Sequence, residues 1–206
     1  MPLKAFGINC TLKPSSAKEA SSTDRLLRDL MAELERHDVD GDFVRALDYD
    51  IKPGVLSNMG KGDDWPTLRQ RIIEADIFIL GSPIWLGQPS SIAKRVLERM
   101  DAFLGETDAA GRMPAFDKIA LVAIVGNEDG AHHCHAACFQ ALNDVGFTIP
   151  ANAGLYWVGE AMGKTNYIDL PDTPETIADA IAMTASNAAH LAMSLKTNPF
   201  PGLREG

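Results

Sequence analysis

The chain has 206 residues, of which 46% are hydrophobic and 23% charged, and its formal net charge is −9. A chain of this size and composition is expected to form one globular domain that buries roughly 70% of its unfolded surface. The acidic balance argues against nucleic acid as a partner, because phosphate backbones attract basic surfaces, and no apolar run reaches the roughly 18 residues that a membrane span needs.

Apolar runs and helical patterns alternate along the chain. In chain order we expect a strand at Leu3–Asn9, a helix with Ser22 as its N-cap and apolar positions from Leu26 to Leu34, a strand at Asp42–Leu47, a helix at Trp65–Glu74, a strand at Ile77–Leu80, a helix at Pro89–Phe103, a strand at Lys118–Gly126, a helix at 131–145, an extended segment at 147–159, and a last helix opened by residues 173–175. Prolines end that helix and leave a C-terminal arm at about 197–206.

This alternation predicts an α/β fold, with a parallel sheet covered by helices on both faces. We expect a single domain over residues 1–206. The segment Lys118–Gly126 is apolar at every second position in both phases, as a strand buried on both faces should be. Ligands of such sheets bind outside the carboxyl ends of the strands, so the loops after the first, third and fourth expected strands are the place to look for a site.

The loop after the first strand ends in the hydroxyl residues Ser21–Thr23 at the start of a helix. Free N–H groups and the positive end of the helix dipole make such a turn an anion site, and Thr11 and Lys13 can approach the same point. The alternative is that Ser22 only caps the helix. Asp24, the next residue, is unfavourable beside a dianion. The loop contains neither the G-x-G-x-x-G nor the G-x-x-x-x-G-K-[ST] motif.

The loop after the third strand, "GSPIWLGQPSS", is apolar and contains few charges. Pro83 fixes its own backbone and biases Ser82 toward extended conformations, while Gly87 permits close approach to a ligand. The side chains of Ile84–Leu86 would cover a flat aromatic ligand. The alternative is a hydrophobic plug beneath a neighbouring subunit.

The loop after the fourth strand, Gly126–Gly130, has a glycine at each end. The glycines allow tight turns, and the amides of the loop are suited to hydrogen-bond a polar ring edge. The alternative is a turn that happens to be acidic.

The stretch "GSPIWLGQPSSIAKRVLER" resembles the [ST]-P-x-x-x-G-x-P-S-S-x-x-K-x-x-x-[DE]-R segment of flavodoxin-like NAD(P)H-dependent FMN reductases and NAD(P)H:quinone oxidoreductases. The matching positions are Ser82, Pro83, Gly87, Pro89, Ser90, Ser91, Lys94 and Arg99. "SST" and "VGNEDGAHH" are similar to two further loops of the family, although Thr11-Leu12-Lys13 stands where FMN reductases have S-L-R. The family fold is a three-layer sandwich around a five-stranded parallel sheet in the order 2-1-3-4-5.

The resemblance implies that FMN binds at the top of the sheet, with its phosphate on the first loop, its ring on the second and its pyrimidine edge on the third. The residues so implied are Thr11, Ser22, Thr23, Ser82, Pro83, Ile84, Trp85, Leu86, Gly87, Gly126, Asn127, Glu128, Asp129 and Gly130. No catalytic side chain is implied, because the flavin carries the redox chemistry.

The implied activity is electron transfer from NADH or NADPH through FMN to a quinone-like or other small acceptor, in a homodimer or higher homo-oligomer. Two alternatives stay open. One is a flavodoxin-type electron carrier without a dedicated substrate. The other is a domain of this fold that has lost FMN, since a fold does not fix a function.

The segment "HHCHAAC", residues 132–138, invites a metal hypothesis, but metal ligands normally converge from more than one segment. We therefore expect no metal site. The N-terminus lacks the apolar core of a signal peptide, and the chain has three cysteines, which cannot all pair. We expect reduced thiols in a cytoplasmic protein.

Overall fold

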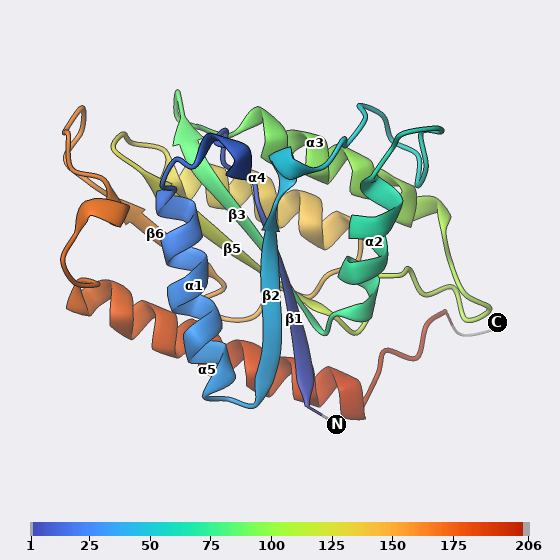
Figure 1. Ribbon diagram of the computed structural model, residues 1–206. Helices are drawn as coiled ribbons and strands as arrows, with labels where there is room; N and C mark the ends of the chain where they lie inside the picture. The colour runs from blue at the N-terminus through green and yellow to red at the C-terminus, as the bar shows by residue number, and fades with distance from the viewer. Residues whose placement is uncertain (1, 204–206) are drawn as a thin grey trace.

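Parallel strands form the centre of the molecule (Figure 1), described here from a computed structural model that covers residues 2–203. They are β1 (Leu3–Asn9), β2 (Val39–Arg45), β3 (Ile77–Trp85), β5 (Ile119–Gly126) and β6 (Gly154–Val158). Their order is β2-β1-β3-β5-β6, which in chain order of the parallel strands is the expected 2-1-3-4-5. The sheet counts six strands rather than five, because β4 (Gln88–Pro89) pairs antiparallel with the end of β3.

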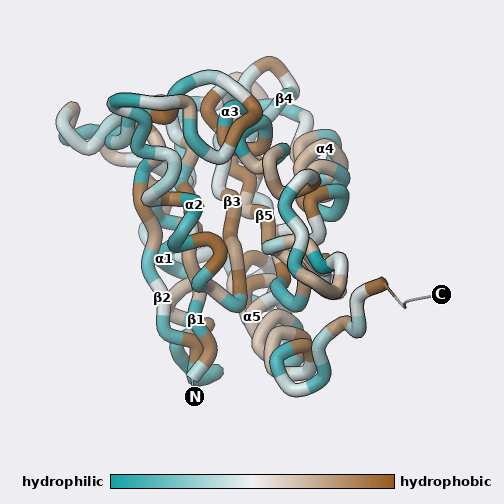
Figure 2. The backbone as a smooth tube through the Cα atoms, turned by 90° about the vertical axis from the view of Figure 1, so that its right-hand side faces the viewer, coloured by the Kyte–Doolittle hydropathy of each residue, from teal (hydrophilic) through white to brown (hydrophobic). Residues whose placement is uncertain are grey.

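Helices cover both faces of the sheet (Figure 1). On one face lie α1 (Ser22–Glu35) and α5 (Glu175–Thr197), and on the other lie α2 (Trp65–Glu74), α3 (Ser91–Met100) and α4 (Ala131–Asp144). Short 3₁₀ turns occur at η1 (Ser15–Ala17), η2 (Ala46–Asp48), η3 (Asp101–Gly105) and η4 (Tyr167–Asp169). Each layer of helices buries a separate apolar core against the sheet, and β3 and β5 are the apolar centre that Figure 2 shows.

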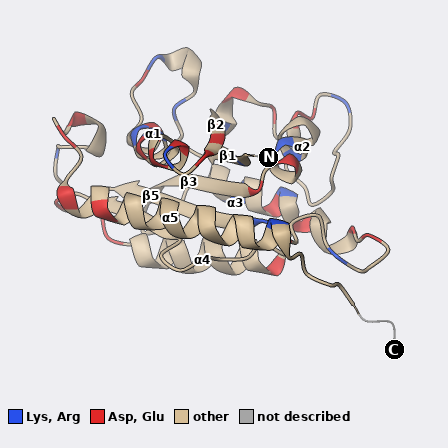
Figure 3. Cartoon of the chain, turned by 90° about the horizontal axis from the view of Figure 1, so that it is seen from below, with Lys and Arg blue, Asp and Glu red and all other residues tan. Residues whose placement is uncertain are grey.

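The two long helices of one face differ in surface character. Charged residues of both signs lie along α1, whereas most residues of α5 are uncharged (Figure 3). Alanines such as Ala185, Ala188 and Ala192 form the buried side of α5, so that this helix lies close to α1 and the sheet. The apolar spacing that predicted this helix reflects that contact.

Three expected strand and helix boundaries are corrected by pairing and capping. The second strand runs from Val39 to Arg45 and not from Asp42 to Leu47, because its register with β1 starts at the pair Leu3 and Val39 and ends at the pair Asn9 and Arg45. The third strand does not stop at Leu80, because its pairing with β5 continues to Pro83 opposite Val125. The expected helix Pro89–Phe103 is shorter, since the Ser90 hydroxyl caps α3 by accepting from Ala93 N (3.1 Å).

A buried ion pair fixes the long loop between β2 and α2. The side chains of Arg99 and Asp63 have no exposed surface and lie 2.8 Å apart (Arg99 Nη2 to Asp63 Oδ2). The same guanidinium donates to Lys52 O (2.9 Å) and to Leu56 O. The guanidinium donors are thus satisfied, as a buried charge requires. The hydrogen bonds from Arg99 hold the pKa of the Asp63 carboxyl well below its usual range.

The C-terminal arm packs back on the chain up to the last described residue. Leu203 N donates to Ala110 O (2.8 Å), and the rings of Phe200 and Phe116 meet edge to face at 5.9 Å. Within residues 2–203, no helix has both the length and the apolar character of a membrane span.

Candidate functional site

A cavity of about 400 Å³ opens at the carboxyl edge of the sheet, and all three loops singled out in the sequence line it. Its lining consists of Thr11, Leu12, Lys13, Ser21, Ser22, Thr23, Pro83, Ile84, Trp85, Val125, Gly126, Asn127, Glu128, Trp157, Met162, Gly163 and Asn166. The volume lies in the range of roughly 300–1,000 Å³ that small-molecule sites occupy. Nine of the implied cofactor residues therefore share one cavity.

The start of α1 forms the polar end of this cavity. Ser21, not Ser22, is the N-cap, because its Oγ accepts from Asp24 N (3.3 Å). The first backbone bond of the helix runs from Arg25 N to Ser21 O (3.2 Å), so the N–H groups of Ser22 and Thr23 precede it and are directed out of the helix end. These hydroxyls and amides suit a phosphate there, and Lys13 also lines the cavity.

The residues that follow β1 line the same end of the cavity as the start of α1. Thr11 is buried, and its N–H donates to Asn9 Oδ1 (2.9 Å). The Ser22 hydroxyl accepts from Ile168 N (3.2 Å) and so ties α1 to the segment after β6. The prediction that Ser22 caps the helix was wrong, because Ser21 is the cap. Ser22 lines the cavity, which is where the predicted anion site requires it.

The end of β3 supplies an apolar wall. Pro83, Ile84 and Trp85 line the cavity, and Trp85 keeps 52% of its surface exposed. Ser82 is buried and serves the scaffold instead: its Oγ accepts from Ser90 N (2.9 Å), and the Ser90 hydroxyl donates to Cys10 O (2.7 Å). Ser82 and Ser90 together link β3 to the start of α3 and to the end of β1.

The remaining implied residues lie beside the cavity and outside its lining. Leu86 is 91% exposed in a left-handed turn with φ +53°. Gly87 N donates to Glu128 Oε2 (3.0 Å), and a Cβ on Gly130 would stand 2.7 Å from Gly87 Cα. Asp129 belongs to the same turn. Gly87, Glu128 and Gly130 therefore join two loops and set the position of the wall.

A fourth segment, which the sequence analysis did not assign to the site, closes the side next to β6. Met162 N donates to Asn127 O (2.9 Å), and Asn127 Nδ2 donates to Gly163 O (3.3 Å) and Asn166 Oδ1 (3.2 Å). Gly159 N also donates to Gly126 O (2.9 Å). Residues 159–166 are thus held against the loop after β5.

This fourth segment is anchored to α1. Arg25 Nη1 donates to Tyr167 O (2.7 Å) and Leu170 O (2.6 Å), and its guanidinium lies 4.8 Å from the centre of the Tyr167 ring. Tyr167 OH donates to Asp29 Oδ2 (2.7 Å), and burial raises the pKa of Tyr167 to about 12. The Trp157 ring packs on Tyr167 at 5.5 Å. The wall is therefore rigidly supported from outside the cavity.

The missed residues carry a readable signal. Met162, Gly163 and Asn166 follow the last parallel strand in the polar stretch "GEAMGKTN". The rule that sites lie beyond the carboxyl ends of strands applies to that strand as well. Applied to all strands rather than three, it would have placed this segment at the site.

The "HHCHAAC" segment plays a structural part. Cys134 and Cys138 are buried in the core between α4 and the sheet, and His135 hydrogen-bonds to Leu155 O through Nε2 (3.1 Å). Burial lowers the pKa of His135 and raises that of Cys134 to about 11. In the part of the chain that the structure describes, no three His, Cys, Asp or Glu side chains converge as a metal site.

A parallel sheet in this order, with helices on both faces, is a flavodoxin-like fold. Residues 4–163 match the family model described as NADPH-dependent FMN reductase, and the chain belongs to that family. The cofactor so defined is FMN, with NAD(P)H as electron donor. The residues present fit it, because the cavity offers uncharged donors at its helix end and apolar side chains along its length.

Three matches, two found by sequence and one by structure, extend over nearly the whole chain. The 8-demethyl-8-aminoriboflavin-5'-phosphate synthase of Streptomyces davaonensis is 32% identical over 97% of this chain and 81% of its own length. The crystal structure of RosB with bound 8-demethyl-8-formylriboflavin-5'-phosphate has a TM-score of 0.88 and 30% identity, over 97% of this chain and 82% of that one.

The third similar protein is much longer. A Mycobacterium bovis protein named as the divalent metal cation transporter MntH is 37% identical over 94% of this chain. The chain spans only 29% of the length of that relative.

Proposed function

We propose that this protein is an FMN-dependent oxidoreductase that passes electrons from NADH or NADPH to a quinone-like or other small acceptor. The observation that carries the proposal is the meeting of the loops after β1, β3 and β5 around one cavity. Family membership supports an FMN-dependent enzyme, and the nature of the rim supports the acceptor class.

Each wall has a separate role in this proposal. Thr11, Ser22 and Thr23 bind the phosphate, Pro83 to Trp85 cover the ring system, and Asn127 meets its polar edge. The Trp157 ring lines the β6 side and packs on the Tyr167 ring behind it. Asn166 holds Asn127 in place through its side-chain oxygen.

FMN, when bound, supplies hydride acceptance from a nicotinamide and electron delivery to an acceptor. The protein then has to bind, orient and leave one ring face open. Glu128 is the carboxylate in the lining, and it is engaged with Gly87 N. We assign no catalytic side chain.

The rim of the cavity is apolar. Leu12, Trp85, Leu86 and Met162 expose large apolar surfaces near its mouth, and flat apolar molecules are the ligands that such surfaces bind. This supports a quinone-like acceptor. The same rim supports a homodimer or higher homo-oligomer in which a second copy covers part of the mouth.

The direct test is an anaerobic titration of purified FMN-loaded protein with NADH and NADPH, followed by turnover with menadione. The proposal predicts bleaching of the flavin absorption by at least one nicotinamide, and saturable turnover with the quinone. Bleaching without quinone turnover would favour an electron carrier of flavodoxin type. Failure of both nicotinamides to bleach the flavin would contradict the proposal.

A second candidate function is modification of the flavin itself. It is favoured by the likeness to the aminoriboflavin phosphate synthase and to RosB, which extends over 97% of the chain in both cases. Here FMN would be a substrate changed at its 8-methyl group. Mass analysis of the flavin recovered after aerobic incubation with FMN and an amino-group donor separates the two, because a reductase returns FMN with unchanged mass.

A further inference from the structure

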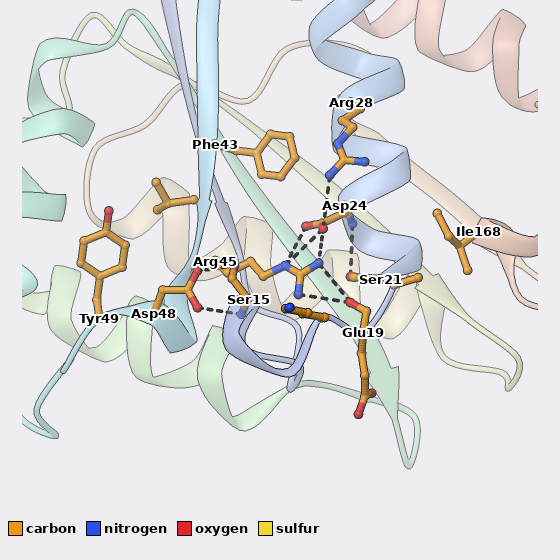
Figure 4. Close-up of a pocket in the computed structure, with 13 residues that line it drawn as sticks. Ser15, Glu19, Ser21, Asp24, Arg28, Phe43, Arg45, Asp48, Tyr49 and Ile168 are labelled. Atoms are coloured by element: carbon orange, nitrogen blue, oxygen red, sulfur yellow. Dashed lines mark hydrogen bonds and ion pairs between the residues drawn. The ribbon is translucent and has the colours of Figure 1, made fainter.

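A buried carboxylate, Asp24, directly follows the residues of α1 that line the cavity, but its side chain lines a second pocket on the β2 side of α1, the pocket drawn in Figure 4. Asp24 is the third residue of α1, next to Thr23, and its side chain is only 7% exposed. A carboxylate there offsets the positive potential of the helix N-terminus, which would otherwise attract an anion. It also repels a phosphate, which carries about 1.5 to 2 negative charges at neutral pH. Its charge has to be balanced before a dianion can bind a few residues away.

Arg45, the last residue of β2, provides that balance. Its Nε lies 3.1 Å from Asp24 Oδ2 and 3.2 Å from Oδ1, and its Nη2 contacts the same carboxylate. Asn9 Nδ2 donates to Asp24 Oδ1 from the end of β1. These contacts raise the pKa of Arg45, since the charged form is the one that Asp24 stabilises.

The same guanidinium holds the loop that leads to α1. Arg45 Nη1 donates to Lys13 O (3.0 Å) and Glu19 O (3.4 Å), so that the two ends of the intervening turn are tied to one side chain. Figure 4 shows Arg45 between Asp24 and the Glu19 backbone, on the β2 side of α1. Ser15, at the tip of the turn, is fixed separately by Asp48.

A second arginine near the carboxylate serves as an internal comparison. Arg28 Nη2 lies 3.6 Å from Asp24 Oδ2, but its side chain is 67% exposed, whereas that of Arg45 is 12% exposed. Exposed ion pairs contribute little, because water screens them. The two arginines thus face one carboxylate with very different degrees of burial.

We propose that Arg45 is a positioning residue for the flavin phosphate: it neutralises Asp24 and fixes the loop after β1, so that a dianion binds at the start of α1. This inference rests on the proposed function, because it needs FMN as the ligand. It assigns to β2 a part in selecting the phosphorylated flavin over the unphosphorylated one, although no residue of β2 lines the cavity.

The test compares FMN with riboflavin, which lacks the phosphate. Each purified, flavin-free variant is titrated with both flavins, and the ratio of the two Kd values measures the preference for phosphate. Arg45→Met should lower this preference by about tenfold or more, because an unbalanced charge acts at short range in a partly buried site. The riboflavin Kd should stay within about twofold, since the ring walls are untouched.

Two matched variants make the result specific. Arg28→Met should leave the preference unchanged, because Arg28 is exposed and makes no loop contact. Asp24→Asn added to Arg45→Met should restore most of the preference, since it removes the charge that Arg45 balanced. Should Arg45→Met fail to fold, Asp24→Asn alone should keep or raise the preference.

The opposite results overturn the inference. Equal weakening of FMN and riboflavin in Arg45→Met would indicate a merely structural role, and a double variant no better than Arg45→Met would exclude charge balance. A weaker preference for FMN over riboflavin in Asp24→Asn alone would also exclude charge balance. If the wild-type protein binds neither flavin, the proposed function fails; if it binds FMN and Arg45→Met keeps the preference, only the inference about Arg45 fails.

Discussion

Gly87 and Gly130 lie backbone against backbone. A Cβ on Gly130 would stand 2.7 Å from Gly87 Cα and 2.8 Å from Gly87 O, and Gly130 has φ +127°. The loops after β3 and β5 meet at this point, next to the hydrogen bond from Gly87 N to Glu128. The width of the cavity therefore depends on two residues that have no side chain.

Gly130→Ala should damage both stability and flavin binding. Gly60→Ala is the matched control, because Gly60 also has a positive φ (+94°) and a Cβ there meets nothing within 4 Å. The control should lose about 1 kcal/mol of unfolding free energy from backbone strain alone. Gly130→Ala should lose a further 1–3 kcal/mol, roughly, from overlap. Equal losses in urea titrations would show that the loop contact is unimportant.

Ser22→Asp should weaken FMN binding while leaving the fold intact. The substitution places a negative charge on the cavity wall where the phosphate is proposed to bind, and like charges repel at short range. We expect a loss of at least about tenfold in affinity, or 1.4 kcal/mol. Ser186→Asp on the exposed side of α5 makes the same change in net charge and should leave the FMN Kd unaltered. An unchanged Kd in Ser22→Asp would refute this placement of the phosphate.

Asp63→Asn should be strongly destabilising at neutral pH. It leaves the fully buried Arg99 without its counter-charge, and breaking a buried pair on one side costs about 3–5 kcal/mol. Because folding depresses the pKa of Asp63, its contribution is fully present above the unfolded pKa of about 3.9 and is lost as pH falls below that value. The gap in stability between wild type and variant should therefore shrink below about pH 4, and a pH-independent gap would contradict the charge argument.

The three cysteines should be unreactive in the native protein. Cys10, Cys134 and Cys138 are buried, and burial raises the pKa of Cys134 to about 11 and that of Cys138 to about 12. The thiolate is the reactive form, so Ellman's reagent at pH 8 should label none of them until denaturant is added. Rapid labelling of the folded protein would show that α4 is not packed as described.

Much of this fold and site was readable from periodicity and strand ends. Leu3–Asn9 and Trp65–Glu74 were predicted to the residue, because apolar spacing there follows burial directly. The end of β3 was not, since Gly81 and Pro83 read as a loop although partner strands keep them extended. Long-range pairing of this kind leaves no local pattern.

The site shows the same division between local and long-range information. Ser22 and Thr23 could be assigned because a helix start is a local feature. Three other features could not be predicted from local sequence, because each depends on how distant segments meet. They are the close approach of Gly87 to Gly130, the wall formed by residues 159–166, and the contact of Arg45 with Asp24. Asp24 did signal a conflict with a bound anion in the sequence, and its resolution lies in a residue from another strand.

The most direct test of the central claim is equilibrium titration of the flavin-free protein with FMN, followed by fluorescence quenching. If the loops after β1, β3 and β5 form one flavin site, FMN should bind with a stoichiometry of one per chain, with micromolar or tighter affinity and more tightly than riboflavin. No saturable binding, or binding that ignores the phosphate, would contradict it.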